Sequence, residues 1–563
     1  MSKNTNNTYI SEYLRNHSIN TQEDIDNILN MEESDIQTGA AMKNAEEFNE
    51  NIINEIKAGN RILVFGDYDT DGVMATVVAV RALRSLSKIL TGTEGHISYY
   101  INDRFVDGYG ISAESIRKIL LRNPKLDTII TVDNGIVAFD AVDYAKTRGL
   151  KVIITDHHQP LETVPNAYVV VDPHQAGDLS KFKEISGTTV IYKLMLNLFD
   201  TYFHDDLDLI SNLIDFVGVS VVSDVMPMLY ENRIYVKKAV DVFNNKGAQR
   251  LRLSWYVITE YLHKIGKLKG DSVFTEQDFG FVFSPIINAQ SRINGQANIA
   301  VDLFLSTSTD DIREKASFMV DVNEERKDIS NAAFARVMET DYSGMPIVII
   351  RDDTLGEGVI GLIAGKITEA YNRPSVVLTA VDDNTLKGSA RSIEGVNILN
   401  ELRKLDKHMT ALGGHAGAAG LSLKLDEFNE FKEEAIEQLS HVVPADLGND
   451  VIADMTIQAE DFSKSLVNDF NELAPFGNGF EKPLFEVKDL KITDSKVIGK
   501  QKDHLRIVSK DTTILLWGGA KEFADDAKES NSMDVIGNPG INVFNNKESL
   551  QLIVEKNAIV FHK

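Results

Sequence analysis

The sequence predicts an α/β protein with two successive α/β units and a β-rich C-terminal part. Short apolar runs alternate with helical patterns between residues 62 and 171, an order typical of a doubly wound parallel sheet. A long polar helix is predicted from Asp311 to Met338, and a second strand–helix alternation begins at Met345. From Asp450 onward, short and regularly spaced strands predict a small barrel.

The overall composition is typical of a soluble globular protein. Of the 563 residues, 43% are hydrophobic and 25% are charged, and the length predicts about three or four domains. Lysine and arginine number 58 against 84 aspartates and glutamates, which gives a net charge of −26. This charge argues against a general nucleic-acid coat protein but leaves room for a local basic groove. No cysteine is present, which excludes disulfides and thiolate zinc sites.

The N-terminal sequence and the apolar segments predict a cytoplasmic protein without a membrane partner. Met1 to Asn20 is polar and lacks an apolar signal core. No apolar segment reaches the roughly 18 residues that are needed to span a bilayer. Met1 to Asp35 is expected to be a loose arm with one short helix.

Three aspartates spaced two apart follow the first predicted strand. Ile62 to Phe65 is apolar and too short for a buried helix, so we expect a strand of a parallel sheet. Asp67, Asp69 and Asp71 then lie at its C-terminal end, where open α/β sheets bind their ligands. Carboxylates this close repel one another unless a cation lies among them. A helix N-cap with solvated turn carboxylates is the alternative, but this pattern favours a metal site.

Two later strands of the same run also end in acidic or imidazole side chains. One ends in Asp133, and the other ends in Asp156-His157-His158. Because the C-terminal ends of parallel strands share one edge of a sheet, we expect these groups to meet the first three aspartates. Asp224 follows a separate apolar segment and could add a carboxylate, although a single aspartate is equally well explained as a cap. The strands are predicted at 62–65, 128–132 and 152–154, and the apolar segment spans 213–222.

Aspartate and histidine without cysteine suit Mn²⁺ or Mg²⁺ rather than a structural zinc ion. About five carboxylates and two imidazoles are too many ligands for one ion, and they fit a carboxylate-bridged pair of ions. In two-metal phosphoester hydrolysis, one ion activates the attacking water and both stabilise charge on the scissile phosphate. Of the two adjacent imidazoles, one can bind a metal while the other contacts phosphate or donates a proton.

Two further stretches suggest nucleic-acid binding more weakly. Asn232 to Gly270 holds nine Lys/Arg against two acids, with Trp255, Tyr256 and Tyr261 among them. Such a stretch can form a groove for single strands, but on its own it is better explained as a solvated helix face with core aromatics. Gly413 to Gly420 could bring backbone N–H groups to a phosphate, or it could simply form a tight turn.

With these motifs the chain resembles the DHH/DHHA1 phosphoesterase superfamily, and within it the RecJ-like exonucleases. The DHH motifs are Gly66–Gly72, Val132–Gly135, Asp156–His158 and Ser223–Pro227. The DHHA1 motifs are Gly358–Gly361, Arg373-Pro374, Lys387–Ser392 and Gly413–Gly420. RecJ-like features are Asp103-Arg104 with Gly108–Gly110, Pro285–Arg292, Asn323 with Arg326-Lys327, and Leu473–Gly477. The likeness covers about residues 40 to 560. Departures from the pattern include Phe65, Ile286 and Gly356, and the segment Asn478–Phe480 is rearranged.

The resemblance implies a fold, a division into domains and a set of site residues. The fold would be a parallel-sheet DHH domain, a long helical connector, a smaller α/β DHHA1 domain and a C-terminal OB-fold barrel. The domains would be an arm (1–39), the DHH domain (40–245), a basic helical connector (246–344), DHHA1 (345–445) and the OB-fold (446–563). Metal ligands would be Asp69, Asp71, Asp133, His157 and Asp224, with Asp67, Asp156 and His158 in catalytic support. Substrate contacts would be Arg104, Arg292, Ser389, Arg391, Gly414 and His415.

The function that the resemblance implies is metal-dependent 5′→3′ hydrolysis of single-stranded DNA in recombination or repair, with two Mn²⁺ or Mg²⁺ ions. The partners would be the 5′ end of the strand and a single-strand-binding protein or helicase, and the chain would be a monomer. One alternative is a phosphodiesterase of short oligonucleotides or cyclic dinucleotides, which would need no C-terminal barrel. A non-catalytic DNA-bound scaffold is less favoured because every main acidic motif is present.

Overall fold

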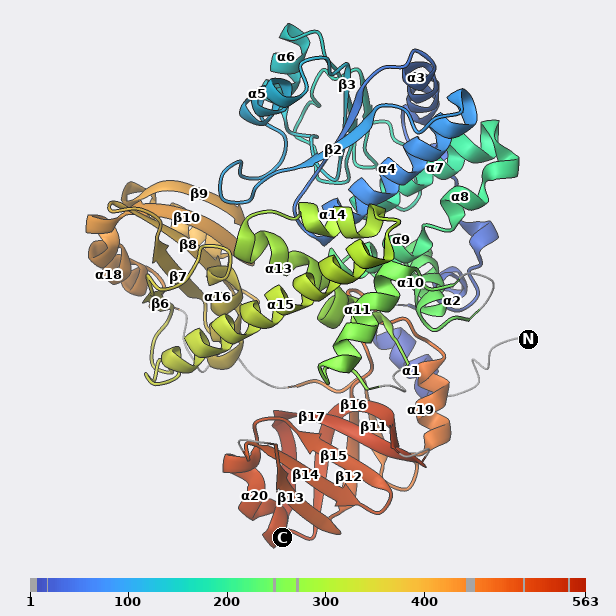
Figure 1. The fold of residues 1–563 in the computed structure, drawn as a ribbon. Helices are drawn as coiled ribbons and strands as arrows, with labels where there is room; N and C mark the ends of the chain where they lie inside the picture. The colour runs from blue at the N-terminus through green and yellow to red at the C-terminus, as the bar shows by residue number, and fades with distance from the viewer. Residues whose placement is uncertain are drawn as a thin grey trace. The chain divides into compact units, whose positions relative to one another are not determined.

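The computed structural model describes residues 8–17, 19–246, 250–269, 273–441, 451–499, 502–544 and 547–563 (Figure 1). The chain forms two compact units. The large unit comprises Gln37–Asp224 and Lys238–Leu447, and the small unit comprises Met1–Ile36, Val225–Lys237 and Gly448–Lys563. The expected boundary between residues 445 and 446, and the first seven residues of the arm, lie outside the described residues.

A five-stranded parallel sheet forms the N-terminal part of the large unit, as the sequence predicts. The strand order is β2-β1-β3-β4-β5, and all neighbouring strands are parallel. The strands are β1 (Ile62–Gly66), β2 (Ile97–Ile101), β3 (Thr128–Val132), β4 (Lys151–Thr155) and β5 (Val169–Val171). The apolar runs are short and buried because helices cover both faces of such a sheet.

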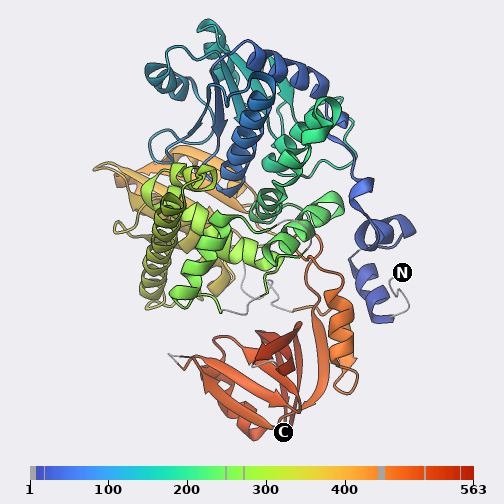
Figure 2. The same ribbon diagram turned by 45° about the vertical axis from the view of Figure 1, so that its right-hand side comes forward.

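Helices cover the two faces of this sheet in different ways. Leu63 and Phe65 of β1 pack with apolar residues of α5 (Ala113–Arg122) and α6 (Phe139–Thr147) on one face. The other face carries α3 (Ala45–Lys57), α4 (Thr70–Thr91) and α7 (Gly187–Tyr202). Figures 1 and 2 both show α4 beside α7. The first half of α4 is buried on nearly every side, so this helix is fixed where it leaves β1.

The middle of the large unit is helical, and its aromatic residues form a core. Trp255 is fully buried against Phe243, Phe283 and Phe304, and its Nε1 donates to Asp215. Trp255 therefore does not provide a stacking surface for bases, and the core interpretation holds for this residue. The helices are α8 (Asp208–Ser211), α9 (Ile214–Ser223), α11 (Leu253–Lys264), α12 (Glu276–Asp278), the π-helix η4 (Phe279–Phe283), α13 (Ser284–Asn294), α14 (Asn298–Leu305) and the long α15 (Thr309–Val337). Helix α10 (Tyr230–Phe243) belongs to the large unit only from Lys238 onward, and its earlier residues are assigned to the small unit.

A second five-stranded sheet follows, with mixed strand directions and the order β6-β7-β8-β10-β9. Its strands are β6 (Val348–Arg351), β7 (Ser375–Ala380), β8 (Thr385–Arg391), β9 (Met409–His415) and β10 (Ala418–Lys424), and its helices are α16 (Ile360–Tyr371), α17 (Ile398–Arg403) and α18 (Phe428–Gln438). The glycine run forms a hairpin in which Gly413 pairs with Gly420. The run is therefore two strands joined by a tight turn at residues 416–417.

The small unit is built on a seven-stranded sheet with the order β11-β12-β16-β17-β15-β14-β13. Its strands are β11 (Met455–Gln458), β12 (Phe485–Lys491), β13 (Asp494–Ile498), β14 (His504–Ser509), β15 (Thr512–Leu516), β16 (Ser532–Phe544) and β17 (Lys547–His562). Its helices are α1 (Thr8–Asn16), α2 (Gln22–Leu29), α19 (Lys464–Asn471) and α20 (Ala520–Glu529). The expected arm is not loose over α1, because Tyr13 is fully buried against Phe470 and Phe480. Among the described residues, no helix combines the length and apolar character needed to cross a membrane.

Candidate metal centre and neighbouring anion pocket

The predicted acidic groups gather at one edge of the N-terminal sheet. The ends of β1, β3 and β4 are in register, and the loops that follow them carry Asp67, Asp133 and Asp156. Strand β2 lies on one side of β1 and β3 lies on the other, so the strand order reverses at β1. This edge is therefore a topological switch point, where open α/β sheets bind ligands. Asp224 reaches the same place from the C-terminal end of α9 rather than from a strand.

Asp71 is held by the N-terminus of α7 and by α9. Its Oδ2 accepts a hydrogen bond from the Gly187 N–H at 2.7 Å. Its Oδ1 accepts from the Thr188 N–H at 2.9 Å and from the Thr188 hydroxyl at 2.6 Å, and the Ser220 hydroxyl donates to the same oxygen. These positioning residues were missed in the sequence. Their only local signal is Ser186, which caps α7 before an apolar run.

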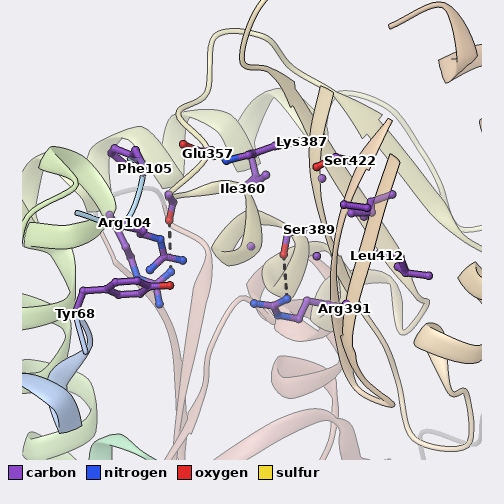
Figure 3. A pocket seen from close by; sticks show the side chains of 18 residues that line it. Tyr68, Arg104, Phe105, Glu357, Ile360, Lys387, Ser389, Arg391, Leu412 and Ser422 are labelled. Carbon is purple, nitrogen blue, oxygen red and sulfur yellow. Dashed lines mark hydrogen bonds and ion pairs between the residues drawn. The ribbon is translucent and has the colours of Figure 1, made fainter. Parts of the chain in front are cut away.

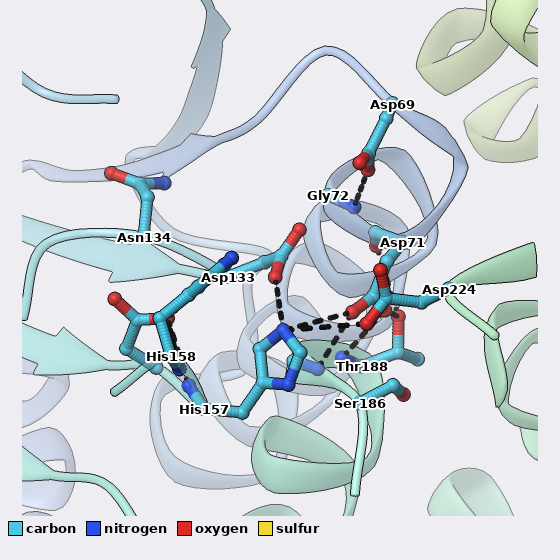
Figure 4. A network of polar contacts seen from close by, with 12 residues as sticks. Asp69, Asp71, Gly72, Asp133, Asn134, His157, His158, Ser186, Thr188 and Asp224 are labelled. Atoms are coloured by element: carbon cyan, nitrogen blue, oxygen red, sulfur yellow. Dashed lines mark hydrogen bonds and ion pairs between the residues drawn. The ribbon is translucent and has the colours of Figure 1, made fainter. Parts of the chain in front are cut away.

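One nitrogen of His157 faces three carboxylates from different parts of the chain. His157 Nε2 lies 3.0 Å from Asp133 Oδ1, 3.5 Å from Asp224 Oδ2 and 3.7 Å from Asp71 Oδ2 (Figure 4). All but Asp224 are buried, and Asp224 is partly exposed. The structure thus brings His157 together with three of the four carboxylates that were predicted as metal ligands.

Asp133 stands in an unusual backbone position under the N-terminus of α7. Its φ is 61°, in the left-handed region that aspartate tolerates better than most residues. A Cβ on Gly187 would lie 2.5 Å from the Asp133 Cβ, which is closer than real atoms approach. The absence of a side chain at Gly187 therefore lets α7 approach Asp133 while its N–H groups reach Asp71.

Burial and mutual repulsion raise the pKa of most of the acidic groups. The pKa values of Asp67 and Asp133 lie well above the usual range because both are buried and because Asp69 and Asp71, respectively, lie near them. Burial and Asp71 raise the pKa of Asp69, and they raise that of Asp224 to about 9. Within the described part of the chain, the buried Oδ1 of Asp67 has no hydrogen-bond donor. A cation among these groups would offset the repulsion between the carboxylates and would give the Asp67 oxygen a positively charged partner.

The ligand atoms form overlapping sets that fit two divalent cations. Each of three sets has its ligand atoms within 4.8 Å of one another: Asp71/His157/Asp224, Asp67/Asp69/Asp133 and Asp133/His157/His158. Asp133 and His157 each belong to two sets, so they link neighbouring positions. Asp69 also caps α4, and its Oδ1 accepts from the Gly72 N–H at 3.0 Å. Oxygen-rich sets with imidazole suit Mn²⁺ or Mg²⁺.

Asp156 and His158 form a pair beside the metal set. His158 Nδ1 lies 2.7 Å from Asp156 Oδ1, and His158 Nε2 lies 3.1 Å from the Tyr109 hydroxyl. Burial would lower the pKa of His158, but the hydrogen bond to Asp156 and the charges of Asp156, Asp224 and Asp71 together outweigh it and raise that pKa to about 9. The other Asp156 oxygen accepts from the Ile136 N–H at 2.9 Å, which fixes the carboxylate. His158 is thus held as a cation next to the metal set.

A basic pocket of about 520 Å³ lies in the same unit, between the DHH-like part and the second sheet. Arg104, Arg292, Ser389 and Arg391 line it, as does Tyr68 (Figure 3). Burial, together with the charges of Arg104, Arg326 and Arg391, lowers the pKa of Arg292 to about 10. Arg391 Nη1 donates to the Ser389 hydroxyl at 3.0 Å. Mutually repelling guanidinium groups around a cavity favour a bound anion.

Two glycines of the DHHA1-like motif create this pocket. A Cβ on Gly358 would lie 2.0 Å from the backbone oxygen of Arg292, and a Cβ on Gly361 would lie 3.0 Å from both Arg391 Nη2 and Ser389 Oγ. Glu357 and Lys387 also line the pocket and form an ion pair with each other. The sequence did not single out Tyr68 or Lys387 as pocket residues.

Gly414 and His415 do not belong to the residues that line this pocket. Both lie on β9, and His415 Nδ1 accepts a hydrogen bond from the Gly417 N–H at 3.2 Å. The Gly413 and Gly420 backbones do line the pocket. The structure therefore gathers four of the six predicted substrate contacts and leaves these two outside the cavity.

Three family models match the chain in the order that the fold shows. They are described as "DHH family, N-terminal domain" at residues 61–219, "DHHA1 domain" at 344–441 and "RecJ OB domain" at 453–556. The fold and the acidic site thus define a DHH-type protein that carries a DHHA1 and an OB domain.

The chain belongs to the RecJ family. It is 30% identical over 532 residues to the "Single-stranded-DNA-specific exonuclease RecJ" of Salmonella typhimurium, an alignment that covers 90% of this chain and 88% of that protein.

Two solved structures share the fold. One is RecJ of Thermus thermophilus in complex with Mn²⁺, with a TM-score of 0.76 and 22% identity, covering 99% of this chain and 76% of that one. The other is titled as exonuclease RecJ bound to manganese, with a TM-score of 0.61 and 25% identity, covering 72% of this chain and 97% of that one.

Proposed function

We propose that this protein is a hydrolase that degrades single-stranded DNA from its 5′ end in a metal-dependent reaction, in recombination or repair. The observation that carries the proposal is the presence, in one compact unit, of a carboxylate–imidazole cluster for cations and an arginine pocket for an anion. The family membership supports the proposal, because the Salmonella relative is named as a single-stranded-DNA-specific exonuclease.

The cation pair would be Mn²⁺ or Mg²⁺, in keeping with the manganese named for the two solved relatives. Asp69, Asp71, Asp133, His157 and Asp224 would hold the ions, and Asp67 would support them. When bound, such ions lower the pKa of water and neutralise charge on a phosphodiester. The buried, donor-free Oδ1 of Asp67 and the raised pKa values of Asp67 and Asp133 are the features that fit this cofactor.

The protein's own side chains would orient the strand and supply charge. Arg104, Arg292 and Arg391, with Ser389, would bind the phosphate at the 5′ end. His158, held as a cation by Asp156, would donate from Nε2 to a phosphate oxygen in place of its contact with Tyr109. Gly187, Thr188 and Ser220 would keep Asp71 in one orientation, so the cluster is arranged before the substrate arrives.

The proposal extends to the location, oligomeric state, partners and domain boundaries of the chain. The chain would act as a cytoplasmic monomer that meets its substrate with a single-strand-binding protein or a helicase. The domains would divide at 39/40, 245/246, 344/345 and 445/446. Residues 225–237, included in the second of these domains, fall in the same compact unit as the C-terminal sheet.

A labelled-strand assay tests the proposal. A 5′-labelled and a 3′-labelled 40-nucleotide strand would be incubated with Mn²⁺, Mg²⁺ or EDTA. We expect immediate release of labelled mononucleotide from the 5′ label and a shrinking ladder from the 3′ label, both stopped by EDTA. Asp133→Asn is the matched inactive control. Full activity in EDTA, or a preference for dinucleotides over the long strand, would overturn the proposal; the second result would favour a small-substrate phosphodiesterase.

A further inference from the structure

A second basic cavity lies along the C-terminal half of α4, away from the metal centre. Its volume is about 850 Å³. Arg81, Arg84 and Lys88 of α4 line it and are spaced three and four residues apart, so they share one face of the helix. Asp71, at the start of the same helix, is about 15 Å from Arg81 along the helix axis and about 26 Å from Lys88. The cavity is therefore separate from the proposed catalytic cluster.

The guanidinium of Arg81 has too few acceptors for a buried charge. One Nη donates to the backbone oxygen of Phe304, whereas the buried Nε has no acceptor among the described residues. Burial and the nearby charge of Arg252 lower the pKa of Arg81 to about 10. A buried charged donor without an acceptor is costly, and the charge of an anion in the cavity would stabilise the guanidinium.

Of the other basic groups that line the cavity, Arg252 has a charged partner, whereas Arg84 and Lys88 have none among the described residues. Arg84 donates to the backbone oxygen of Ile97 at a long 3.3 Å, and Lys88 makes no ion pair with any residue that the structure describes. Arg252 is neutralised by Asp215 at 2.7 Å. The negative end of the helix dipole accounts for Lys88 in the last turn of α4, but it does not account for Arg81, which lies about two turns earlier.

The other walls of the cavity decide which anion fits. Leu209, Leu213 and Leu305 provide an apolar side, on which a nucleobase can lie. Asp206 and Glu94 line the cavity too, and they can accept hydrogen bonds from sugar hydroxyl or base amino groups. A cavity of this size is in the range of small-molecule sites.

We propose that this cavity binds a nucleoside monophosphate, with its phosphate on Arg81, Arg84 and Lys88 and its base against the leucine wall. Such a ligand combines a compact anion with a flat, partly apolar ring and hydrogen-bond donors, which is the combination that these walls offer. The site goes beyond the proposed nuclease function, because hydrolysis at the metal centre needs no second nucleotide site on the far half of α4.

Calorimetric titration of the full-length, Mn²⁺-loaded protein with dTMP tests the site by stoichiometry. The arginine pocket near the metal centre supplies one binding event, so we expect two dTMP per wild-type chain and one per chain of the Arg84→Glu/Lys88→Glu variant. Lys146→Glu, an exposed substitution on α6 with the same kind of charge reversal, should keep two. Equal stoichiometry in all three proteins would overturn the proposal.

Further titrations distinguish the possible sources of the phosphate, and an activity measurement checks that the variants fold. Inorganic phosphate should bind the cavity at least about tenfold more weakly than dTMP, a difference of about 1.4 kcal/mol. Equal affinity, or a loss seen only with an oligonucleotide or only with an acidic peptide, would overturn the nucleotide assignment. Leu209→Asp, at a half-exposed wall position, should also remove one site. The Arg84→Glu/Lys88→Glu and Leu209→Asp variants should both cleave single strands at the wild-type rate, which would show that they fold. The decisive quantity is the loss of one site between wild type and variant, and this difference does not depend on whether the arginine pocket also binds dTMP, as the nuclease proposal assumes.

Discussion

Gly187 and Asp133 approach so closely that a Cβ on Gly187 would lie 2.5 Å from the Asp133 Cβ. We therefore expect Gly187→Ala to push Asp133 out of place and to loosen the N–H groups that hold Asp71. Cleavage should fall by at least about 10²-fold, as when one preorganised polar contact is lost. Mn²⁺ affinity, measured by calorimetry, should fall with it.

Gly365→Ala in α16 is the matched control for that substitution. A Cβ on Gly365 meets nothing within 4 Å, so the change should leave cleavage unaltered. Alanine in a helix is favoured over glycine by about 1 kcal/mol, so this variant should be slightly more stable. Wild-type metal affinity in Gly187→Ala would show that the close approach has no role in placing Asp133.

His157 is the group on which three carboxylates converge, so its removal should act on turnover more than on strand binding. We expect His157→Ala to lower kcat by about 10²–10³-fold. Affinity for a non-hydrolysable single strand, measured by fluorescence anisotropy, should change by less than about threefold, since the arginine pocket is untouched. A His157→Ala enzyme with more than about a tenth of wild-type kcat would contradict the assignment of this imidazole as a metal ligand.

Arg391 should matter most when the strand carries a terminal phosphate. A hydrogen bond between charged groups contributes about 1.5–3 kcal/mol, so Arg391→Ala should weaken binding of a 5′-phosphorylated strand by about 10- to 100-fold. Binding of the same strand with a 5′-hydroxyl should change little. The exposed Arg403→Ala on α17 provides the charge-matched control. An equal loss for both strands would place Arg391 on the backbone of the strand rather than at its end.

Glu55 links α3 to the sheet and should make stability depend on pH. The carboxylate is buried and accepts from Thr128 Oγ1 at 2.5 Å, from Asn60 at 2.8 Å and from Lys151. Burial would raise the pKa of Glu55, but these donors hold it below its usual value. A depressed acid pKa adds stability above the unfolded value of about 4.3, and that stability is lost as pH falls through the lower folded pKa.

Glu55→Gln should therefore reduce stability by about 1–3 kcal/mol at pH 7. The difference from wild type should shrink below about pH 4, where the wild-type carboxyl also becomes protonated. Thermal unfolding at pH 7 and at pH 3.5 measures both values. Glu46→Gln, at an exposed position on the same helix, should have no effect at either pH. A pH-independent loss for Glu55→Gln would mean that packing, rather than charge, explains the contribution.

The parts of the fold that the sequence predicted are those with a short-range signal. The strand before Asp67 was predicted because an apolar run of that length cannot form a buried helix, and the convergence of Asp67, Asp133 and Asp156 followed from strand polarity. The apolar segment before Asp224 has no periodicity that separates strand from helix, and it proved to be α9. The glycine run gave no sign of its hairpin, because the pairing of Gly413 with Gly420 depends on strands on either side.

Contacts between distant residues could not be predicted from local patterns. Asp71 and Thr188 are brought together only by the packing of α4 on α7, and nothing in either segment identifies the other. Trp255 follows the interpretation that the sequence favoured for this stretch on its own: basic and aromatic residues are interleaved along the chain, and the indole is buried in the core, where it donates to Asp215. Periodicity describes one element at a time, and these features belong to pairs of elements.

The donors around Asp71 also restrict how a cation can approach it. Three of them use Oδ1, which leaves that oxygen without a free lone pair, whereas Gly187 is the one donor to Oδ2 among the residues that the structure describes. Only Oδ2 can serve as a ligand atom, and it is the oxygen that faces His157. Asp71 is thus a one-sided ligand, so a longer acid such as glutamate, or an amide with one donor end, could not reproduce the direction from which it offers its charge.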